Sequence, residues 1–197
     1  MPPRWNAALG VWEGNRAAGA AVPSPLFVFG YGSLCWKVDF PIASKFVGTI
    51  CGWQRFFCQR STDHRGTPES PGLVASVLSD ENLQALGLRA AGAPPSECCG
   101  QCYRVPDADA SAVLDALDFR EKGGYTREVV EVTPIDGSQP VQALLYTATP
   151  ENPNFERTAL TDPAADEQAR AQRRSMKAEG MKMTWWRQGA QEGPAVE

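Results

Sequence analysis

The chain has 197 residues, of which 43% are hydrophobic and 21% are charged, so it is long enough to bury one sizeable core. The formal net charge is -4, whereas binding to nucleic acid requires a basic face, so we expect no nucleic-acid partner. No apolar run approaches the roughly 20 residues that a helix needs to cross a bilayer, so we expect a soluble protein that does not bind membranes.

Both ends of the chain differ in composition from its middle. Residues 1–24 are rich in alanine, glycine and proline and show no sustained hydrophobic period, which predicts a disordered tail. Order is expected to begin near residue 25 and to continue to residue 155. Residues 156–197 are charged and prone to form helix, but they have almost no apolar stripe, so we expect a divergent, weakly structured tail.

The folded domain opens with strand signals. Residues 26–29 form an apolar run that stops at the glycine-rich stretch 30–34, which predicts a buried strand leading into a loop. Residues 45–59 are β-branched and aromatic and predict one long or bent strand, with bulges or bends at Gly48 and Gly52.

The next part of the chain alternates between polar stretches and strands. Residues 60–72 are polar and predict a loop, and residues 73–78 predict a strand. A surface insertion is expected over residues 82–97, followed by a strand over residues 98–105. Asp107 is then a suitable N-cap for a helix.

The predicted helix carries an apolar stripe of Val113, Leu114 and Leu117. Residues 127–135 and 141–148 follow it and predict an antiparallel hairpin. Strands that are mostly antiparallel, with one or two inserted helices, indicate an α+β class. Such a number of strands favours a closed or highly curved sheet.

A dense charged cluster ends the predicted helix and is followed by Gly123 and Gly124. The cluster consists of Asp118, Arg120, Glu121 and Lys122. A helix end beside two glycines can hold a carboxylate at the wall of a pocket, with cations near enough to control its ionisation. A solvated helix end with a glycine C-cap explains the same pattern.

The glycine-rich stretch 30–34 is the second candidate site. Its backbone N–H groups can turn towards an anion and form a nest, although a plain tight turn fits the same sequence. It is not a dinucleotide-binding fingerprint, because the third glycine and the following helix are missing.

Six cysteines and a single histidine limit the metal, redox and nucleophilic chemistry that the chain can support. Residues 1–24 contain no apolar stretch typical of a secretory signal, so we expect reduced thiols in a cytoplasmic protein. In a strand, Cys98 and Cys102 share one face while Cys99 points to the other, so we expect no zinc site at this C-x-x-C. His64 lies in the predicted loop, where we favour a structural or pocket-wall role. Carboxylates are then the candidate proton carriers, with Glu121 first and Asp118 second.

Three stretches in this order, "FVFGYGSLCWKVDFP", "STDHRGTPESPG" and "LDFREKGGY", resemble the ChaC-like γ-glutamylcyclotransferases, in particular the glutathione-specific branch. The resemblance covers residues 26 to about 155. It implies a compact β-barrel with flanking helices and a lyase reaction that needs no metal or cofactor. In that reaction the α-amino group of glutathione attacks the carbonyl of its own γ-glutamyl side chain, which releases 5-oxoproline and cysteinylglycine.

The resemblance also assigns site residues. It places the catalytic acid/base at Glu121, and it places the substrate loop at Gly30, Tyr31, Gly32, Ser33, Leu34 and Cys35. The family commonly has an aliphatic residue where this chain has Cys35, a change that we expect to be tolerated because the loop contributes mainly backbone. Two alternatives stay open: a cyclotransferase for other γ-glutamyl peptides, and a catalytically silent protein that binds γ-glutamyl compounds.

Overall fold

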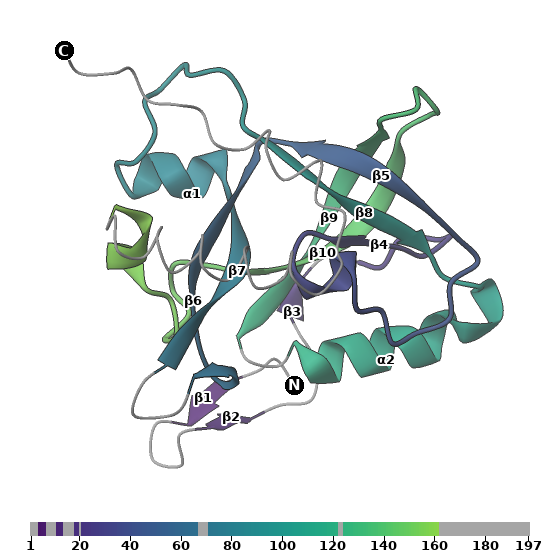
Figure 1. The fold of residues 1–197 in the computed structure, drawn as a ribbon, viewed down its shortest axis with the longest axis horizontal. Coiled ribbons are helices and arrows are strands. Elements are labelled where there is room, and N and C mark those ends of the chain that lie inside the picture. The colour runs from purple at the N-terminus through teal and green to yellow at the C-terminus, as the bar shows by residue number, and fades with distance from the viewer. Residues whose placement is uncertain are drawn as a thin grey trace.

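Five strands close into a barrel in the computed structural model, which describes residues 4–6, 11–13, 18–19, 21–66, 71–121 and 124–161 (Figure 1). The barrel order is β10-β4-β8-β5-β9, and β9 pairs again with β10 to close it. Within this barrel only the β10–β4 pair is parallel, so the predicted mostly antiparallel barrel is confirmed. The strands are β4 (Phe27–Gly30), β5 (Ser44–Cys51), β8 (Glu97–Arg104), β9 (Tyr125–Pro134) and β10 (Val141–Ala148).

Alternation along the strands supplies the core inside the barrel. On β8, Cys98 and Cys102 are buried while Cys99 is only half-buried, as the strand prediction required. Val130 and Val132 of β9 point into the same apolar cluster. The β9–β10 hairpin was also predicted correctly, with Val141 opposite Val132 at its turn end.

Two glycines allow the barrel strands to approach closely. Gly48 on β5 pairs directly with Gly100 on β8 in an unbroken register, so the pair contains no bulge at Gly48. A Cβ at Gly48 would lie 2.6 Å from Val132 Cγ1, so the position needs glycine because of crowding. Gly52, with φ of +80°, does bend the chain, and it divides the predicted single strand into β5 and β6.

A two-stranded ribbon lies beside the barrel, formed by β6 (Trp53–Gly66) and β7 (Pro71–Ser79). The predicted loop over residues 60–72 is therefore wrong for most of its length, because β6 continues to Gly66 and β7 begins at Pro71. The prediction failed because it relied on apolar residues. Backbone pairing, such as that of Arg60 with Leu73, extends this ribbon into the polar residues that follow Gln59.

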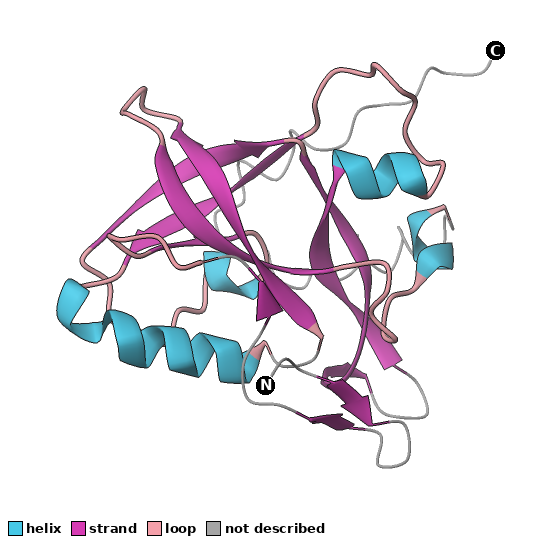
Figure 2. Cartoon of the chain, turned by 180° about the vertical axis from the view of Figure 1, so that it is seen from behind, coloured by secondary structure: helices cyan, strands magenta, loops and turns pink. Residues whose placement is uncertain are grey.

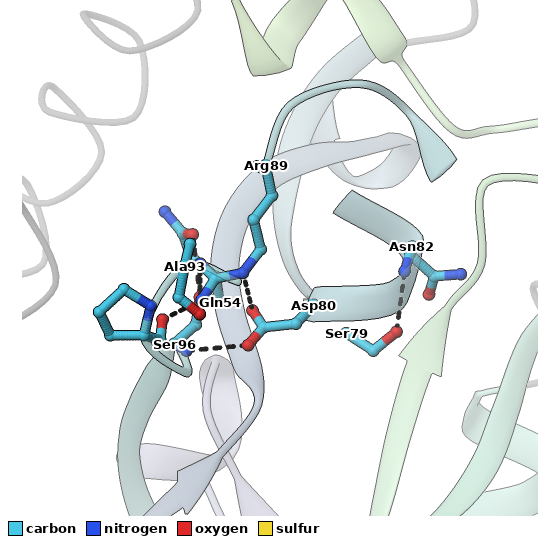
Figure 3. A network of polar contacts seen from close by, with 8 residues as sticks. Gln54, Ser79, Asp80, Asn82, Arg89, Ala93 and Ser96 are labelled. Carbon is cyan, nitrogen blue, oxygen red and sulfur yellow. Dashed lines mark hydrogen bonds and ion pairs between the residues drawn. The ribbon is translucent and has the colours of Figure 1, made fainter. Parts of the chain in front are cut away.

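Helix α1 (Asp80–Ala85) begins just before the predicted surface insertion and overlaps its start. The Ser79 hydroxyl caps it by accepting a hydrogen bond from the N–H of Asn82 at 3.1 Å (Figure 3). A loop then leads back to the barrel. Figures 1 and 2 show α1 next to the ribbon, on the side of the molecule away from the second helix, α2.

Helix α2 (Ala110–Arg120) packs against the barrel through Val113 and Leu117, which are buried as predicted, and through the partly buried Leu114. The predicted N-cap at Asp107 is wrong, because a 3-10 turn, η2 (Asp107–Asp109), precedes the helix and no side chain caps it. The Asp107 carboxylate instead faces the guanidinium of Arg104 at 3.4 Å.

Three short strands lie in the segment that was predicted to be disordered: β1 (Arg4–Asn6), β2 (Val11–Glu13) and β3 (Ala18–Gly19). β1 pairs with β2, and β3 adds to the barrel sheet beside β9. Of the predicted C-terminal tail, only residues 156–161 are described, and they contain a 3-10 turn, η3 (Arg157–Leu160). In the described part of the chain, no helix combines the length and apolar character needed to cross a membrane.

Candidate active site

The glycine-rich loop begins where β4 ends. A Cβ at Gly30 would lie 2.6 Å from Leu34 Cβ, so the chain can fold back on itself there only with glycine. The loop then forms a 3-10 turn, η1 (Ser33–Cys35), whose first hydrogen bond runs from the N–H of Cys35 to the carbonyl of Gly32 at 2.9 Å. The N–H groups of Ser33 and Leu34 precede that bond, so the turn itself gives them no acceptor.

Two side-chain hydrogen bonds stabilise the glycine loop. The hydroxyl of Tyr103 donates to the carbonyl of Leu34 at 2.5 Å, and the thiol of Cys35 donates to the carbonyl of Gly30 at 3.0 Å. Burial raises the pKa of the Cys35 thiol to about 12, so it stays protonated and able to donate. The cysteine therefore fits the loop as a packed, hydrogen-bonded side chain.

The loop is also fixed to β10, the strand that pairs with β4. The side chain of Tyr31 is buried, and its hydroxyl donates to the backbone carbonyl of Tyr146 on β10 at 2.8 Å. Leu34 packs in the same apolar cluster as Val113 and Leu117 of α2. The glycine loop and helix α2 therefore share one core.

Glu121 follows the last residue of α2. Its backbone N–H still bonds to the carbonyl of Leu117 at 2.9 Å, and its side chain is 20% exposed. Arg120 Nε lies 3.0 Å from Glu121 Oε1, while Arg120 Nη1 lies 3.1 Å from Asp39 Oδ1, on the segment after the glycine loop. Arg120 thus joins the carboxylate to that segment and confirms one of the two predicted neighbouring cations. The side chain of the other, Lys122, lies outside the described residues.

A small surface pocket opens between α2 and the segment after the glycine loop. Its polar rim is the Arg120–Asp39 ion pair, and its base is apolar. The pocket is lined by Asp39, Phe40, Val113, Ala116, Leu117 and Arg120.

Three tyrosines lie close enough to Glu121 for its charge to affect their ionisation: Tyr31, Tyr125 and Tyr146. Burial is the largest cause that raises the pKa of each phenol, and the negative charge of Glu121 raises each pKa further. All three therefore remain neutral hydroxyl donors at physiological pH. Tyr31 comes from the predicted loop, and the shared packing of Leu34 and Leu117 also brings the end of α2 near that loop.

The sequence analysis missed Tyr125 and Tyr146 as site residues. Tyr125 ends the "LDFREKGGY" stretch, so its place after the two glycines was an available signal. Tyr146 appeared only as one apolar position in a predicted strand. Its location at the site depends on the pairing of β10 with β4 and β9, which no local pattern reveals.

Asp118, the second candidate proton carrier, is fully buried and already has partners. Its Oδ1 accepts from the Tyr146 hydroxyl at 2.7 Å, and its Oδ2 lies 3.3 Å from Arg127 Nη1. Both carboxylate oxygens of Asp118 are therefore occupied by contacts within the protein. The side chain of His64, the predicted pocket-wall residue, lies outside the described residues.

Within the described ranges, no three His, Cys, Asp or Glu side chains are grouped so that they could hold a metal ion. Cys98 and Cys99 have pKa values raised by burial, which favours neutral thiols over the thiolates that bind metals.

Comparisons with known proteins agree with this geometry. The sequence model of the ChaC-like protein family matches residues 26–180, which extends past the motifs that ended near residue 155. Glutathione-specific gamma-glutamylcyclotransferase 1 of Homo sapiens is 38% identical over 138 residues, or 68% of this chain and 55% of the relative. The chain thus spans about half the length of that relative. The Danio rerio protein of the same name is 35% identical over 147 residues, or 73% of this chain and 68% of the relative.

The fold is also similar to a solved structure. The crystal structure of a yeast gamma-glutamyl cyclotransferase specific to glutathione matches with a TM-score of 0.57 and 29% identity, over 66% of this chain and 71% of that one. The family match covers well over half of the residues, and the barrel, the glycine loop and the carboxylate at the end of α2 are all present. The chain belongs to the ChaC-like family.

Proposed function

We propose that this protein is a γ-glutamylcyclotransferase that cleaves glutathione to 5-oxoproline and cysteinylglycine. The activity printed in the names of its human and zebrafish relatives supports the proposal. The observation that carries it is that Arg120 joins Glu121 to Asp39 after the glycine loop, while Leu34 of that loop packs in one cluster with Leu117 of α2. A carboxylate able to move protons thus lies beside a loop able to bind an anion.

The reaction needs a base because the α-amino group of glutathione is an ammonium at neutral pH and has no free electron pair. Glu121 would take one proton from it. The freed amine would attack the γ-carbonyl carbon, so that the ring C–N bond forms while the C–N bond to cysteine breaks. Glu121 would pass that proton to the departing cysteinyl nitrogen, and the second proton that the ring nitrogen must lose would follow by the same route. Cysteinylglycine then leaves with an ammonium group, and Glu121 ends as the carboxylate that it was at the start. Since nucleophile and electrophile belong to one molecule, holding that molecule folded would supply much of the acceleration.

The glycine loop has a separate role in this mechanism. The N–H groups of Ser33 and Leu34 would bind the α-carboxylate or the oxyanion that develops on the γ-carbonyl. The neutral hydroxyl of Tyr125 would add a donor without adding charge, whereas the hydroxyls of Tyr31 and Tyr146 already donate to the Tyr146 carbonyl and to Asp118. Arg120, paired with both Glu121 and Asp39, would keep the carboxylate from swinging away from the loop.

The test is to incubate purified protein with glutathione and with γ-glutamylalanine in parallel, and to measure 5-oxoproline. We expect release from glutathione alone. The variant Glu121→Gln should lower turnover at least 100-fold, within the range of a lost general acid/base, while calorimetry should find glutathione binding within a few-fold of wild type. Glu131→Gln, at an exposed position on β9, is the control and should leave the rate unchanged.

Each other outcome points to a different function. Release from both substrates would indicate a cyclotransferase of broader specificity. Binding of glutathione without release, in folded wild-type protein, would indicate the silent binding protein. Turnover by Glu121→Gln equal to wild type would refute the assignment of the acid/base.

A further inference from the structure

A chain of buried polar contacts connects α2, the β9–β10 hairpin and the glycine loop. It starts at Asp118, which is 0% exposed and lies one helical turn before Glu121. The hydroxyl of Tyr146 donates to Asp118 Oδ1 at 2.7 Å, and Arg127 Nη1 lies 3.3 Å from Asp118 Oδ2. A buried carboxylate is tolerated only with such compensation, because an unpaired charge loses its hydration.

The two partners of Asp118 come from neighbouring strands and act together. Arg127 on β9 and Tyr146 on β10 are directly opposite each other in the antiparallel register, so their side chains lie on one face of the hairpin. Both reach the carboxylate of Asp118. Besides the apolar packing of Leu117, the last turn of α2 is thereby attached to the barrel by a fully buried polar contact.

Tyr146 extends the connection to the loop. Its side chain bonds to Asp118, while its backbone carbonyl accepts the hydroxyl of Tyr31 at 2.8 Å. One residue therefore contacts both the helix that carries Glu121 and the loop that begins with Gly30. The negative charge of Glu121 contributes to the raised pKa of Tyr146, which agrees with the position of Tyr146 between the helix end and the loop.

We infer that Asp118 is a positioning residue for the proposed cyclisation, fixing Glu121 relative to the glycine loop through Tyr146 and Arg127. This inference rests on the proposed function. Asp118 is buried and paired, so it acts through Glu121 and not on the substrate. A misplacement of about 1 Å in a reacting group can cost about 100-fold in rate, so loosening this attachment should lower kcat by up to that factor.

The test compares three variants by kcat, KM and thermal unfolding. Asp118→Asn keeps the shape of the side chain but removes its charge, and Tyr146→Phe removes only the hydroxyl and keeps the carbonyl that Tyr31 needs. We expect both to lower kcat by about 10- to 100-fold with little change in KM. If Asp118→Asn fails to fold, Tyr146→Phe alone decides the test.

Asp80→Asn is the matched control. Asp80 also pairs with an arginine at 3.3 Å, Arg89, and accepts from the N–H of Ser96 at 2.9 Å, but it belongs to α1, on the other side of the molecule (Figure 3). We expect this variant to lower the unfolding temperature without changing kcat. Equal losses of kcat in Asp80→Asn and Asp118→Asn would show a general effect of stability and overturn the inference.

A double-mutant comparison separates positioning from independent catalysis. In the Glu121→Gln background, Asp118→Asn should lower the residual rate no further, because the group that it positions is already absent. A further loss of the size seen in the wild-type background would overturn the inference. If wild type cleaves glutathione and both Asp118→Asn and Tyr146→Phe keep full kcat, the inference fails and the proposed function stands. If wild type releases no 5-oxoproline at all, both fail.

Discussion

Gly100 lies on β8 where the barrel wall meets the start of the glycine loop, and Gly100→Ala would place a methyl group in that contact. The new Cβ would lie 2.5 Å from the carbonyl oxygen of Gly30 and 2.5 Å from Phe29 Cζ, about 0.9 Å inside ordinary contact at 3.4 Å. The oxygen belongs to the backbone and also accepts the Cys35 thiol, so it can move only if the loop moves.

Overpacking of this kind costs about 1–3 kcal/mol in the free energy of unfolding. At about 2–4 °C per kcal/mol for a domain of this size, the midpoint of thermal unfolding should fall by roughly 2–12 °C. Displacement of the loop should also weaken substrate binding. We expect KM for glutathione to rise about tenfold, which corresponds to about 1.4 kcal/mol.

Gly48→Ala is the matched control, because Gly48 is the cross-strand partner of Gly100. Its Cβ would meet Val132 Cγ1 at 2.6 Å and the carbonyl of Thr133 at 2.9 Å, so it is comparably crowded but faces β9 instead of the loop. Circular dichroism should show that both variants are destabilised, and 5-oxoproline assays should show a raised KM for Gly100→Ala alone. An unchanged unfolding temperature for Gly100→Ala, or an equal rise of KM in both variants, would refute the reasoning.

Two further predictions concern ionisable groups. Brief alkylation of the native protein at pH 8 should modify the exposed Cys51 before Cys35, Cys58 and Cys102, because burial raises the pKa of those three thiols to about 12. Peptide mass spectrometry would measure the labelling, and equal labelling of all four cysteines would contradict this prediction. Desolvation raises the pKa of Glu128 above its usual value of 4.5, so its ionisation opposes folding as the pH rises through that range. Glu128→Gln should therefore raise the unfolding temperature slightly at pH 7 and leave it unchanged at pH 3. An equal rise at both pH values would show a cause other than ionisation.

The strands that line the barrel could be predicted because burial on one face leaves an alternating pattern. Residues 127–135 show this pattern, whereas residues 141–148 are buried almost continuously; both strands and their antiparallel pairing are confirmed. The continuation of β6 to Gly66 could not be predicted in the same way, because a polar ribbon is specified by backbone pairing. The start of α1 did carry a signal: Ser79 followed by Asp80 and Glu81 is typical of a helix N-terminus.

For the site, local sequence identified the residues that lie on turns but not their distant partners. The glycine loop and the carboxylate cluster both stand at element ends, where glycines and charges are visible in the sequence. The sequence did not distinguish the environments of Asp118 and Glu121, although the two lie one turn apart. The structure separates them, because the cross-strand pair of Arg127 and Tyr146 engages Asp118 and leaves Glu121 beside the loop.

The parallel pairing of β4 with β10 has a consequence for the order of folding. These are the first and last strands of the barrel along the chain, so more than a hundred residues must be synthesised between the two strands that meet there. Until β10 leaves the ribosome, β4 and β9 keep unpaired edges, and Tyr31 lacks the carbonyl that fixes its hydroxyl. A nascent chain released before Val141 would therefore expose strand edges that favour aggregation, and it would lack the organised loop on which the site depends.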